Sequence, residues 1–313
     1  MDQRQIERFV DVVESGSLTR TSRRLHISQP ALSKSLRHLE EQLGAKLLER
    51  GPRGIKVTKF GDVFYRRARS IKAEFRRARE DLDNLIGSTA GQVTLGVTPG
   101  PGVLDSILPQ AVFRVAAKRP DLRVVIRSGT ASELLPSLTC GDIDILFTVL
   151  DEGVSGPDLK IEPLFEDRFV LVVNRRHPLL QAKDITLANL MSYRWVMLQD
   201  ASTLWHTVDE MARRGALERN AIIESNSVVF VRSLASQTDS IGILPSHAAK
   251  LSTESGDLVS LPLERFAENS LLPRLLRPMG LVLSTEFELT PGAAAMLRSI
   301  HTVCYELKLI ELD

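Results

Sequence analysis

The stretch at residues 17–37 constrains the fold more than any other part of the chain, because it contains two helix starts separated by a turn. Ser17 and Ser28 are typical N-cap residues, whose hydroxyl oxygens can accept hydrogen bonds from the free N–H groups of a first helical turn. Pro30 suits the first turn of the second helix, where a missing N–H costs little. The spacing predicts a short helix after Ser17, a turn at His26 and Ile27, and a second helix after Ser28.

The second of these helices is predicted to be amphipathic, because leucines recur three or four residues apart on one face. Its apolar face consists of Leu32, Leu36, Leu39 and Leu43. A supporting helix with the same period is predicted upstream, at Ile6, Phe9, Val10 and Val13. Three such helices can form a helix-turn-helix, whose second helix enters the major groove of DNA. Ordinary helix pairs show the same stripe, so this pattern alone leaves both interpretations open.

The face opposite the leucines carries side chains that suit DNA. Glutamine and lysine can bond to purine edges in the major groove, and arginine can reach phosphates. We therefore expect DNA contacts from Ser28, Gln29, Pro30, Ser33, Lys34 and Arg37.

A short hairpin is predicted directly after this helix, between Glu49 and Thr58. Glycines and a proline make its turn, and Arg50 and Arg53 lie in it. A basic wing beside a recognition helix can contact phosphates or a narrow minor groove, and we add both arginines to the expected DNA contacts. A surface hairpin with incidental arginines is the alternative.

In this order, the residues resemble the N-terminal domain of LysR-type transcriptional regulators. The positions that carry the resemblance are Phe9, Gly16, Ser17, Leu25, Ser28, Gln29, Pro30, Ala31, Ser33, Leu39, Glu40, Leu43, Gly44, Arg50, Thr58 and Gly61. Thr21 and Ser22 stand where the family usually has alanines, and Leu48 where it often has phenylalanine; these departures do not touch the expected DNA contacts. The resemblance implies a winged helix-turn-helix over residues 1–59 and double-stranded promoter DNA as a partner.

The charge distribution agrees with a DNA-binding N-terminus. Residues 1–90 hold 19 Lys and Arg against 12 Asp and Glu, a net charge of +7, whereas the remaining residues hold 21 against 27, a net charge of −6. A basic module on an acidic body fits nucleic-acid binding at one end only. The N-terminus does not read as a signal peptide and no apolar run is long enough to span a bilayer, so we expect a cytoplasmic protein.

A heptad seam follows the predicted wing. Its apolar positions are Phe60, Phe64, Ala68, Ile71, Phe75, Ala78, Leu82 and Leu85. Such a helix exposes an apolar stripe that needs a partner. The resemblance implies that this linker, residues 60–90 with a glycine-rich hinge at its end, pairs with the linker of a second subunit in a homodimer or homotetramer. Packing of the helix on its own chain is the alternative.

From residue 91 onward, predicted strands and helices alternate, which favours an α/β unit with a mainly parallel sheet. The predicted strands are 93–97, 123–127, 143–147, 169–173, 195–198, 241–245 and 279–283, and the main helices are 104–117, 133–139, 227–236 and 290–307. Three short motifs resemble the LysR-type effector domain, whose fold is similar to type 2 periplasmic binding proteins: Gly141-Asp142-Ile143-Asp144-Ile145, Arg176-His177-Pro178-Leu179 and Gly242-Ile243-Leu244-Pro245. The fold class is therefore α plus α/β, with lobe I at 91–163 and 270–313 and lobe II at 164–269.

Ligands of open α/β sheets bind beyond the carboxyl ends of strands and near helix N-termini. The candidates at such places are Thr98, Pro99, Gly100, Ser128, Thr130, Thr148, Gln199, Ser202 and Asn226. Hydroxyl and N–H groups there suit an organic anion as effector, and the resemblance implies the same loops. Helix capping alone is the alternative role for each hydroxyl.

Catalysis has little support in the sequence. It has no phosphate-binding glycine motif, no nucleophile elbow and no metal-spaced His/Cys cluster, so we expect no catalytic residue, metal or cofactor. We interpret His177, Asp142 and Asp144 as structural, and Cys140 and Cys304 as buried thiols. The predicted function is a LysR-type regulator whose promoter binding responds to an effector between the lobes, with RNA polymerase as a further partner. Two alternatives stay open: a two-lobed binding protein or enzyme whose N-terminal helices only mediate association, and a regulator that needs no effector.

Overall fold

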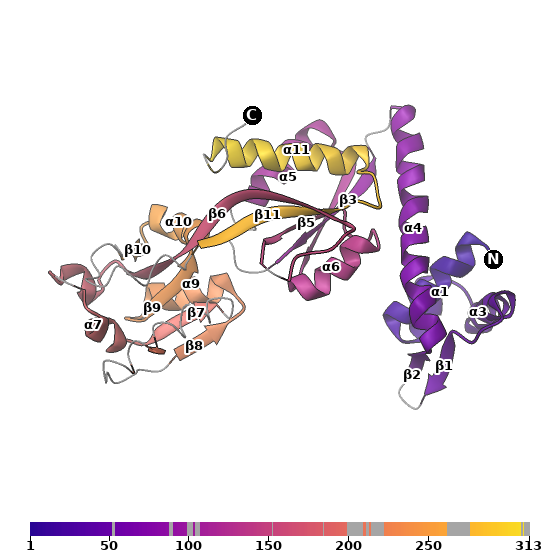
Figure 1. Ribbon diagram of the computed structural model, residues 1–313, viewed down its shortest axis with the longest axis horizontal. Helices are drawn as coiled ribbons and strands as arrows, with labels where there is room; N and C mark the ends of the chain where they lie inside the picture. Colours follow the sequence, from indigo (N-terminus) through magenta and orange to yellow (C-terminus); the bar gives the residue numbers. More distant parts are fainter. Residues whose placement is uncertain are drawn as a thin grey trace.

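A helical N-terminal unit, one long helix and a large mixed sheet follow one another along the chain (Figure 1). The computed structural model describes residues 1–51, 54–87, 90–98, 103, 107–151, 153–183, 185–198, 209–210, 213, 222–261, 276–307 and 309. The predicted fold class, an α unit followed by an α/β unit, is confirmed.

The N-terminal unit contains the predicted helices: α1 (Gln3–Ser15), α2 (Leu18–Arg24) and α3 (Gln29–Leu43). The Ser17 hydroxyl accepts a hydrogen bond from the backbone N–H of Arg20, and the Ser28 hydroxyl accepts one from that of Ala31, so both predicted N-caps are confirmed. His26 has a positive φ of 52° in the turn between the two helices, which lets the chain reverse there.

The leucine stripe of α3 forms the core of this unit together with Phe9. Leu32, Leu36 and Leu39 are buried as predicted. Leu43, the last residue of the stripe, is 39% exposed, because α3 ends there and Gly44 turns the chain away with a φ of 66°. The predicted hairpin is present as the antiparallel strands β1 (Leu48–Gly51) and β2 (Gly54–Val57).

The long helix α4 (Lys59–Leu85) begins at Thr58, whose hydroxyl accepts a hydrogen bond from the backbone N–H of Gly61. Three positions of its predicted seam pack on the N-terminal unit: Ala68 is buried, and Phe64 and Ile71 contact the same core. Phe60, the first position of the seam, is 66% exposed. The second half stays exposed at Phe75, Leu82 and Leu85, by 46%, 64% and 83%. In the part of the chain that the structure describes, no helix has both the length and the apolar character needed to cross a membrane.

The α/β unit is built on a sheet that has nine strands within the described ranges. Eight of them lie side by side in the order β4 (Leu122–Ser128), β3 (Gly91–Val97), β5 (Ile145–Val149), β11 (Leu276–Ser284), β6 (Leu159–Asn174), β9 (Ile241–Pro245), β7 (Trp195–Leu198) and β8 (Ile222–Ser225), and β10 (Leu258–Ser260) pairs with β6. Strands β3, β4 and β5 are parallel, whereas β6 and β11 are antiparallel to each other and connect the two halves of the sheet.

Helices cover both halves of this sheet. In Figure 1, α5 (Ile107–Lys118) and α11 (Pro291–Glu306) lie on one face of the first half and α6 (Ala131–Thr139) on the other. The second half carries α7 (Leu187–Met191), α9 (Val228–Gln237), α10 (Ser246–Glu254) and the short 3₁₀ helix η1 (Pro178–Gln181). Each half has its own apolar core, one around Phe147 and Leu281 and one around Trp195 and Ile243.

Two strand predictions need correction. Strand β5 begins at Ile145 instead of residue 143, because Asp142 and Asp144 make long-range polar contacts before the strand starts. Strand β6 is much longer than the predicted 169–173, because its first half pairs with β11 while its second half pairs with β9. It runs through residue 164, where the lobes are predicted to divide, and the predicted domain and lobe boundaries stay predictions.

Candidate functional site

The start of α3 presents a polar surface to the outside of the N-terminal unit. Ser28, Gln29, Pro30, Lys34 and Arg37 are exposed, and Ser33 is half-buried. The Gln29 side-chain oxygen accepts a hydrogen bond from the Thr19 hydroxyl at 3.3 Å, which ties the start of α3 to α2. The predicted recognition residues thus share one accessible face, while the buried leucines fix the helix from behind.

A hollow of about 540 Å³ lies between this helix and the hairpin. Ser33 and Arg37 line it on the side of α3, and Leu48, Glu49 and Ile55 line it on the side of the strands. The predicted reading face therefore continues onto the wing. Of the two wing arginines, Arg50 lies in β1, and Arg53 lies outside the described residues together with the tip.

Glu40 sets the position of the wing relative to α3. Its carboxylate oxygen Oε1 accepts hydrogen bonds from the backbone N–H groups of Leu47 and Leu48, at 2.8 and 3.0 Å. Sequence reasoning placed Glu40 only among the positions that resemble the family. A glutamate near the end of an amphipathic helix has no local pattern that separates an anchor from a solvated side chain.

Three of the predicted effector residues lie side by side at the carboxyl ends of β4, β3 and β5. Thr98 follows β3, and its hydroxyl donates to the Thr148 hydroxyl of β5 at 3.2 Å. Ser128 ends β4 and pairs with Val97 of β3. Thr98 and Thr148 are buried and Ser128 is exposed, so the row runs from the interior of the sheet to its edge.

The remaining predicted effector residues are not brought into this row. Thr130 lies at the start of α6: its backbone N–H donates to the Glu133 carboxylate at 2.8 Å, and its hydroxyl contacts that of Ser132 at 3.0 Å. Asn226 is exposed between β8 and α9, in the other half of the sheet. Pro99, Gly100, Gln199 and Ser202 lie outside the described residues.

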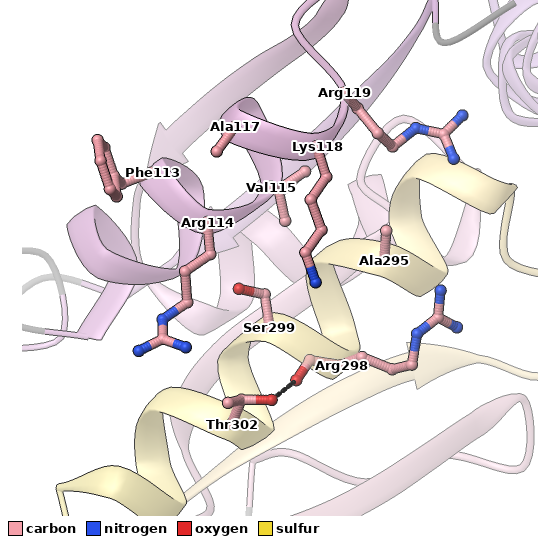
Figure 2. A pocket seen from close by; sticks show the side chains of 10 residues that line it. All are labelled: Phe113, Arg114, Val115, Ala117, Lys118, Arg119, Ala295, Arg298, Ser299 and Thr302. Carbon is pink, nitrogen blue, oxygen red and sulfur yellow. Dashed lines mark hydrogen bonds between the residues drawn. The ribbon is translucent and has the colours of Figure 1, made fainter.

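A second hollow, of about 650 Å³, lies between α5 and α11 (Figure 2). Helix α5 begins beyond the carboxyl end of β3 and runs back along the sheet, and the hollow is lined by its last turns, far from Thr98. Ser299 donates to the backbone oxygen of Ala111 at 2.9 Å, and Arg114 forms an ion pair with Glu306. These contacts join the two helices.

The two cysteines and His177, which we interpret as structural from the sequence, lie in buried surroundings. Burial raises the pKa of the Cys304 thiol to about 12 and also raises that of Cys140, so neither favours its reactive thiolate. His177 is buried against Tyr193, accepts a hydrogen bond from the backbone N–H of Leu179, and has its pKa lowered by burial. Among the described residues, no group of His, Cys, Asp and Glu side chains could hold a metal ion.

A winged helix-turn-helix joined by a long helix to a two-part α/β unit defines a DNA-binding regulator with an effector domain. Residues 3–62 match the family model "Bacterial regulatory helix-turn-helix protein, lysR family", and residues 87–304 match "LysR substrate binding domain". The chain belongs to the LysR family of transcriptional regulators. It is a DNA-binding transcriptional regulator with an effector-binding domain.

Known relatives agree along nearly the whole chain. The HTH-type transcriptional regulator GalR of Pseudomonas putida is 29% identical over 305 residues, which cover 97% of this chain and 74% of GalR. The regulator PcaQ of Agrobacterium fabrum is 27% identical over 305 residues, covering 97% and 95%. The crystal structure of CbnR, a LysR family transcriptional regulator, shares the fold with a TM-score of 0.63 at 20% identity, covering 97% and 99%. Since the relatives are transcriptional regulators, the enzyme alternative is set aside.

Proposed function

We propose that a small organic anion binds at the carboxyl ends of β3, β4 and β5 and changes how this regulator binds its promoter. The observation that carries this proposal is the row formed by Ser128, Thr98 and Thr148. Buried hydroxyls that bond to each other can re-pair with a carboxylate, because a hydrogen bond to a charged group is stronger than one between neutral groups. Gln199, Ser202 and Asn226 would supply the remaining contacts to the bound anion.

The DNA contacts follow from the accessible face of α3. We assign the base edges of the major groove to Gln29, Pro30, Ser33 and Lys34, with Ser28 at the helix start. Arg37, Arg50 and Arg53 contact phosphates or the minor groove. Residues 1–59 form this DNA-binding domain, 60–90 the linker, and 91–313 the effector domain with its two lobes.

The protein assembles as a homodimer or homotetramer. Phe75, Leu82 and Leu85 leave the second half of α4 with an exposed apolar stripe that a second α4 would cover. Further exposed apolar side chains lie on α5, on β4 and on α9. They are Phe113, Ile126, Val229 and Phe230.

Regulation is a shift between two arrangements of the assembly, and the effector binds one of them more tightly. The arrangement sets the spacing of the DNA-binding units. This spacing decides which part of the promoter they cover and therefore which part RNA polymerase can bind. Because its target is promoter DNA, we place the protein in the cytoplasm.

The test uses the full-length protein. A duplex is first selected from a random-sequence library, and a panel of aromatic and aliphatic carboxylates is screened by thermal shift. A carboxylate that raises the melting temperature and changes the mobility-shift pattern on the selected duplex would support the proposal. Sequence-specific DNA binding that responds to no carboxylate would contradict the proposal that the effector is an organic anion. DNA binding without sequence preference would contradict the assigned DNA interface.

A further inference from the structure

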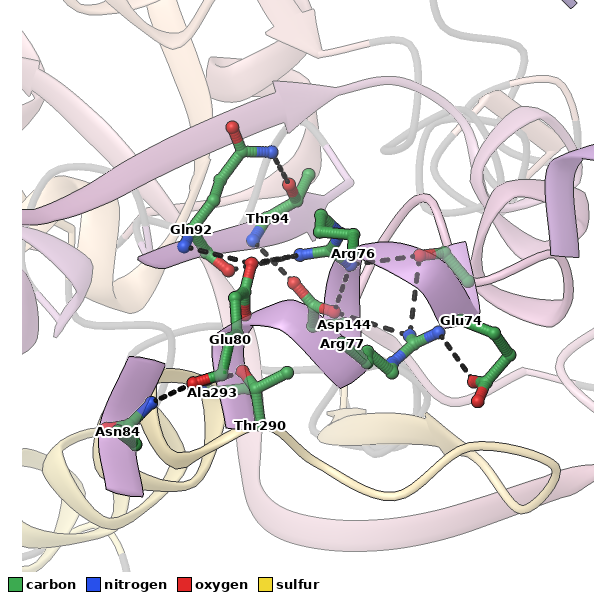
Figure 3. A network of polar contacts seen from close by, with 11 residues as sticks. Glu74, Arg76, Arg77, Glu80, Asn84, Gln92, Thr94, Asp144, Thr290 and Ala293 are labelled. Carbon is green, nitrogen blue, oxygen red and sulfur yellow. Dashed lines mark hydrogen bonds and ion pairs between the residues drawn. The ribbon is translucent and has the colours of Figure 1, made fainter. Parts of the chain in front are cut away.

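The Gly141-Asp142-Ile143-Asp144 motif of the effector domain contacts α4 of the same chain. Arg69 donates through Nε to the Asp142 carboxylate at 2.6 Å and through Nη2 to the Ser137 hydroxyl at 3.0 Å. Two turns further on, Arg76 donates to Asp144 Oδ1 at 2.9 Å and to the backbone oxygen of Gly141 at 3.2 Å. The loop before β5 therefore binds a row of arginines from the linker helix, and Figure 3 shows two of them, Arg76 and Arg77, at Asp144.

Asp144 is the centre of this contact. Its side chain is only 2% exposed, and its Oδ1 lies 2.9 Å from Arg76 and 3.4 Å from Arg77. Its other oxygen, Oδ2, accepts a hydrogen bond from the backbone N–H of Thr94 in β3 at 2.8 Å. One buried carboxylate thus joins the linker helix to the strand that leads to Thr98.

Shape as well as charge fits the loop to the helix. Gly141 has a φ of +78°, and a Cβ on it would lie 2.8 Å from Cβ of Ala73 and 2.6 Å from Nη1 of Arg77. Only glycine allows this approach at that φ. Arg77 is closed off from the other side by the ring of Phe287, whose centroid lies 4.3 Å from its Cζ.

The contact continues toward the end of α4. The Glu80 carboxylate accepts a hydrogen bond from the backbone N–H of Gln92 at 3.2 Å, and Arg119 donates to the Asn84 side-chain oxygen at 2.6 Å. Most of these groups are shielded from water, so the pairs are not ordinary surface ion pairs. Breaking one of them leaves a charge without its partner in a poorly solvated place, which is costly.

We propose that the Gly141–Asp144 loop fixes the linker helix on the effector domain, and we call this loop the seat. Through the seat, ligand binding at the Thr98–Thr148 row changes the position of the DNA-binding unit. The route is short: Thr94, which bonds to Asp144, and Thr98, which bonds to Thr148, are four residues apart on one chain segment. This inference rests on the proposed effector site, but the seat itself can be tested without a ligand.

The test is a charge swap in the full-length protein, read by hydrogen–deuterium exchange. Arg69→Asp and Asp142→Arg each place like charges across the contact, and we expect exchange in the second half of α4 to rise about tenfold. The double variant Arg69→Asp/Asp142→Arg restores an opposite pair and should return exchange toward the wild-type rate. Single variants with wild-type exchange, or a double variant no better than the singles, would overturn the seat.

Two further variants separate loss of this contact from a general effect of changing a charge on α4. Arg79→Asp makes the same change of charge at an exposed position of α4 and should leave exchange unchanged. Arg76→Gln removes the nearer of the two positive charges that face Asp144 without adding a negative one, and should raise exchange in α4 while α1–α3 and α11 stay protected. Equal exchange in Arg76→Gln and wild type would count against the seat.

Transmission is read on DNA. The single charge-swap variants should change the length of the footprint, or the bend, on the duplex selected by the wild-type protein, and the double variant should restore both. If exchange in α4 rises but the footprint is unchanged, the loop fixes the helix but does not transmit ligand binding to the DNA-binding unit. If the wild-type protein selects no duplex, the proposed DNA interface fails, and the exchange experiment still decides the seat.

Discussion

The Glu40 carboxylate accepts a hydrogen bond from the backbone N–H of Leu47 at 2.8 Å, and this bond holds the start of the wing against the recognition helix. The same oxygen accepts the backbone N–H of Leu48 at 3.0 Å. The backbone N–H of Ile55 also donates to the Gly16 backbone oxygen at 3.2 Å, so Glu40 is one of several contacts that position the wing, and it contacts no DNA base in the proposed interface.

Replacing Glu40 by alanine should loosen the wing, because two backbone N–H groups lose their acceptor. We expect a decrease of about 1–3 kcal/mol in the free energy of unfolding, measured by urea titration, and weaker binding to the selected duplex. Glu40→Gln keeps an oxygen acceptor and should retain most of the stability and most of the DNA affinity. Equal stability of Glu40→Ala and wild type would show that the wing does not depend on this bond.

The double variant Ser33→Ala/Lys34→Ala tests the assigned reading face. Both residues lie on the accessible side of α3, so truncating them should lower specific affinity by roughly 1–3 kcal/mol for each base that the variant no longer reads. Arg79→Ala, an exposed change on α4, serves as the control for removal of a positive charge. Unchanged operator affinity in a mobility-shift titration would remove Ser33 and Lys34 from the interface.

Thr98→Val tests the effector row with almost no change in side-chain volume. Removal of one hydroxyl should weaken binding of a carboxylate found in the screen by about 1 kcal/mol, roughly fivefold, while DNA binding without ligand stays the same. Thr302→Val, on the exposed side of α11, makes the same chemical change elsewhere. Calorimetry that shows wild-type affinity in Thr98→Val would refute the assignment.

The sequence predicted the N-terminal unit in detail because its signals are local. Ser17 and Ser28 cap helices within three residues of themselves, and the leucines of α3 repeat at helical spacing. The same reasoning could not foresee the contact between Arg69 and Asp142, which are 73 residues apart and look like solvated charges in the sequence. A charged residue acquires a structural role only when the fold brings its partner to it.

The heptad seam of α4 illustrates the same limit. The apolar spacing predicted that the stripe would be covered, but it could not say by what. Phe64 and Ala68 are covered by the helices of their own chain, as in the alternative interpretation, whereas Leu82 is left exposed. The alternative interpretation therefore holds for Phe64, Ala68 and Ile71, and pairing with a second subunit stays a proposal for the second half.

Leu82→Asp should weaken self-association, since a charge would replace an apolar side chain in the proposed contact between two α4 helices. Burying one leucine contributes roughly 1.5–3 kcal/mol, so the dimer dissociation constant should rise at least about tenfold in sedimentation equilibrium. Tyr305→Asp, an exposed aromatic on α11, is the control. An assembly that keeps its wild-type mass in Leu82→Asp would place the interface elsewhere.

Stability should fall as the solution is acidified below about pH 6.5, in part because of His177. Burial lowers the pKa of His177 in the folded chain, so below its unfolded value of about 6.5 the unfolded state binds the extra proton and is favoured. The slope from this residue is at most about 1.4 kcal/mol per pH unit and ends below the folded pKa. His177→Gln keeps an acceptor for the backbone N–H of Leu179 but does not titrate. Urea midpoints of wild type and variant should therefore diverge with pH, and parallel profiles between pH 7.5 and 5 would show that His177 does not contribute.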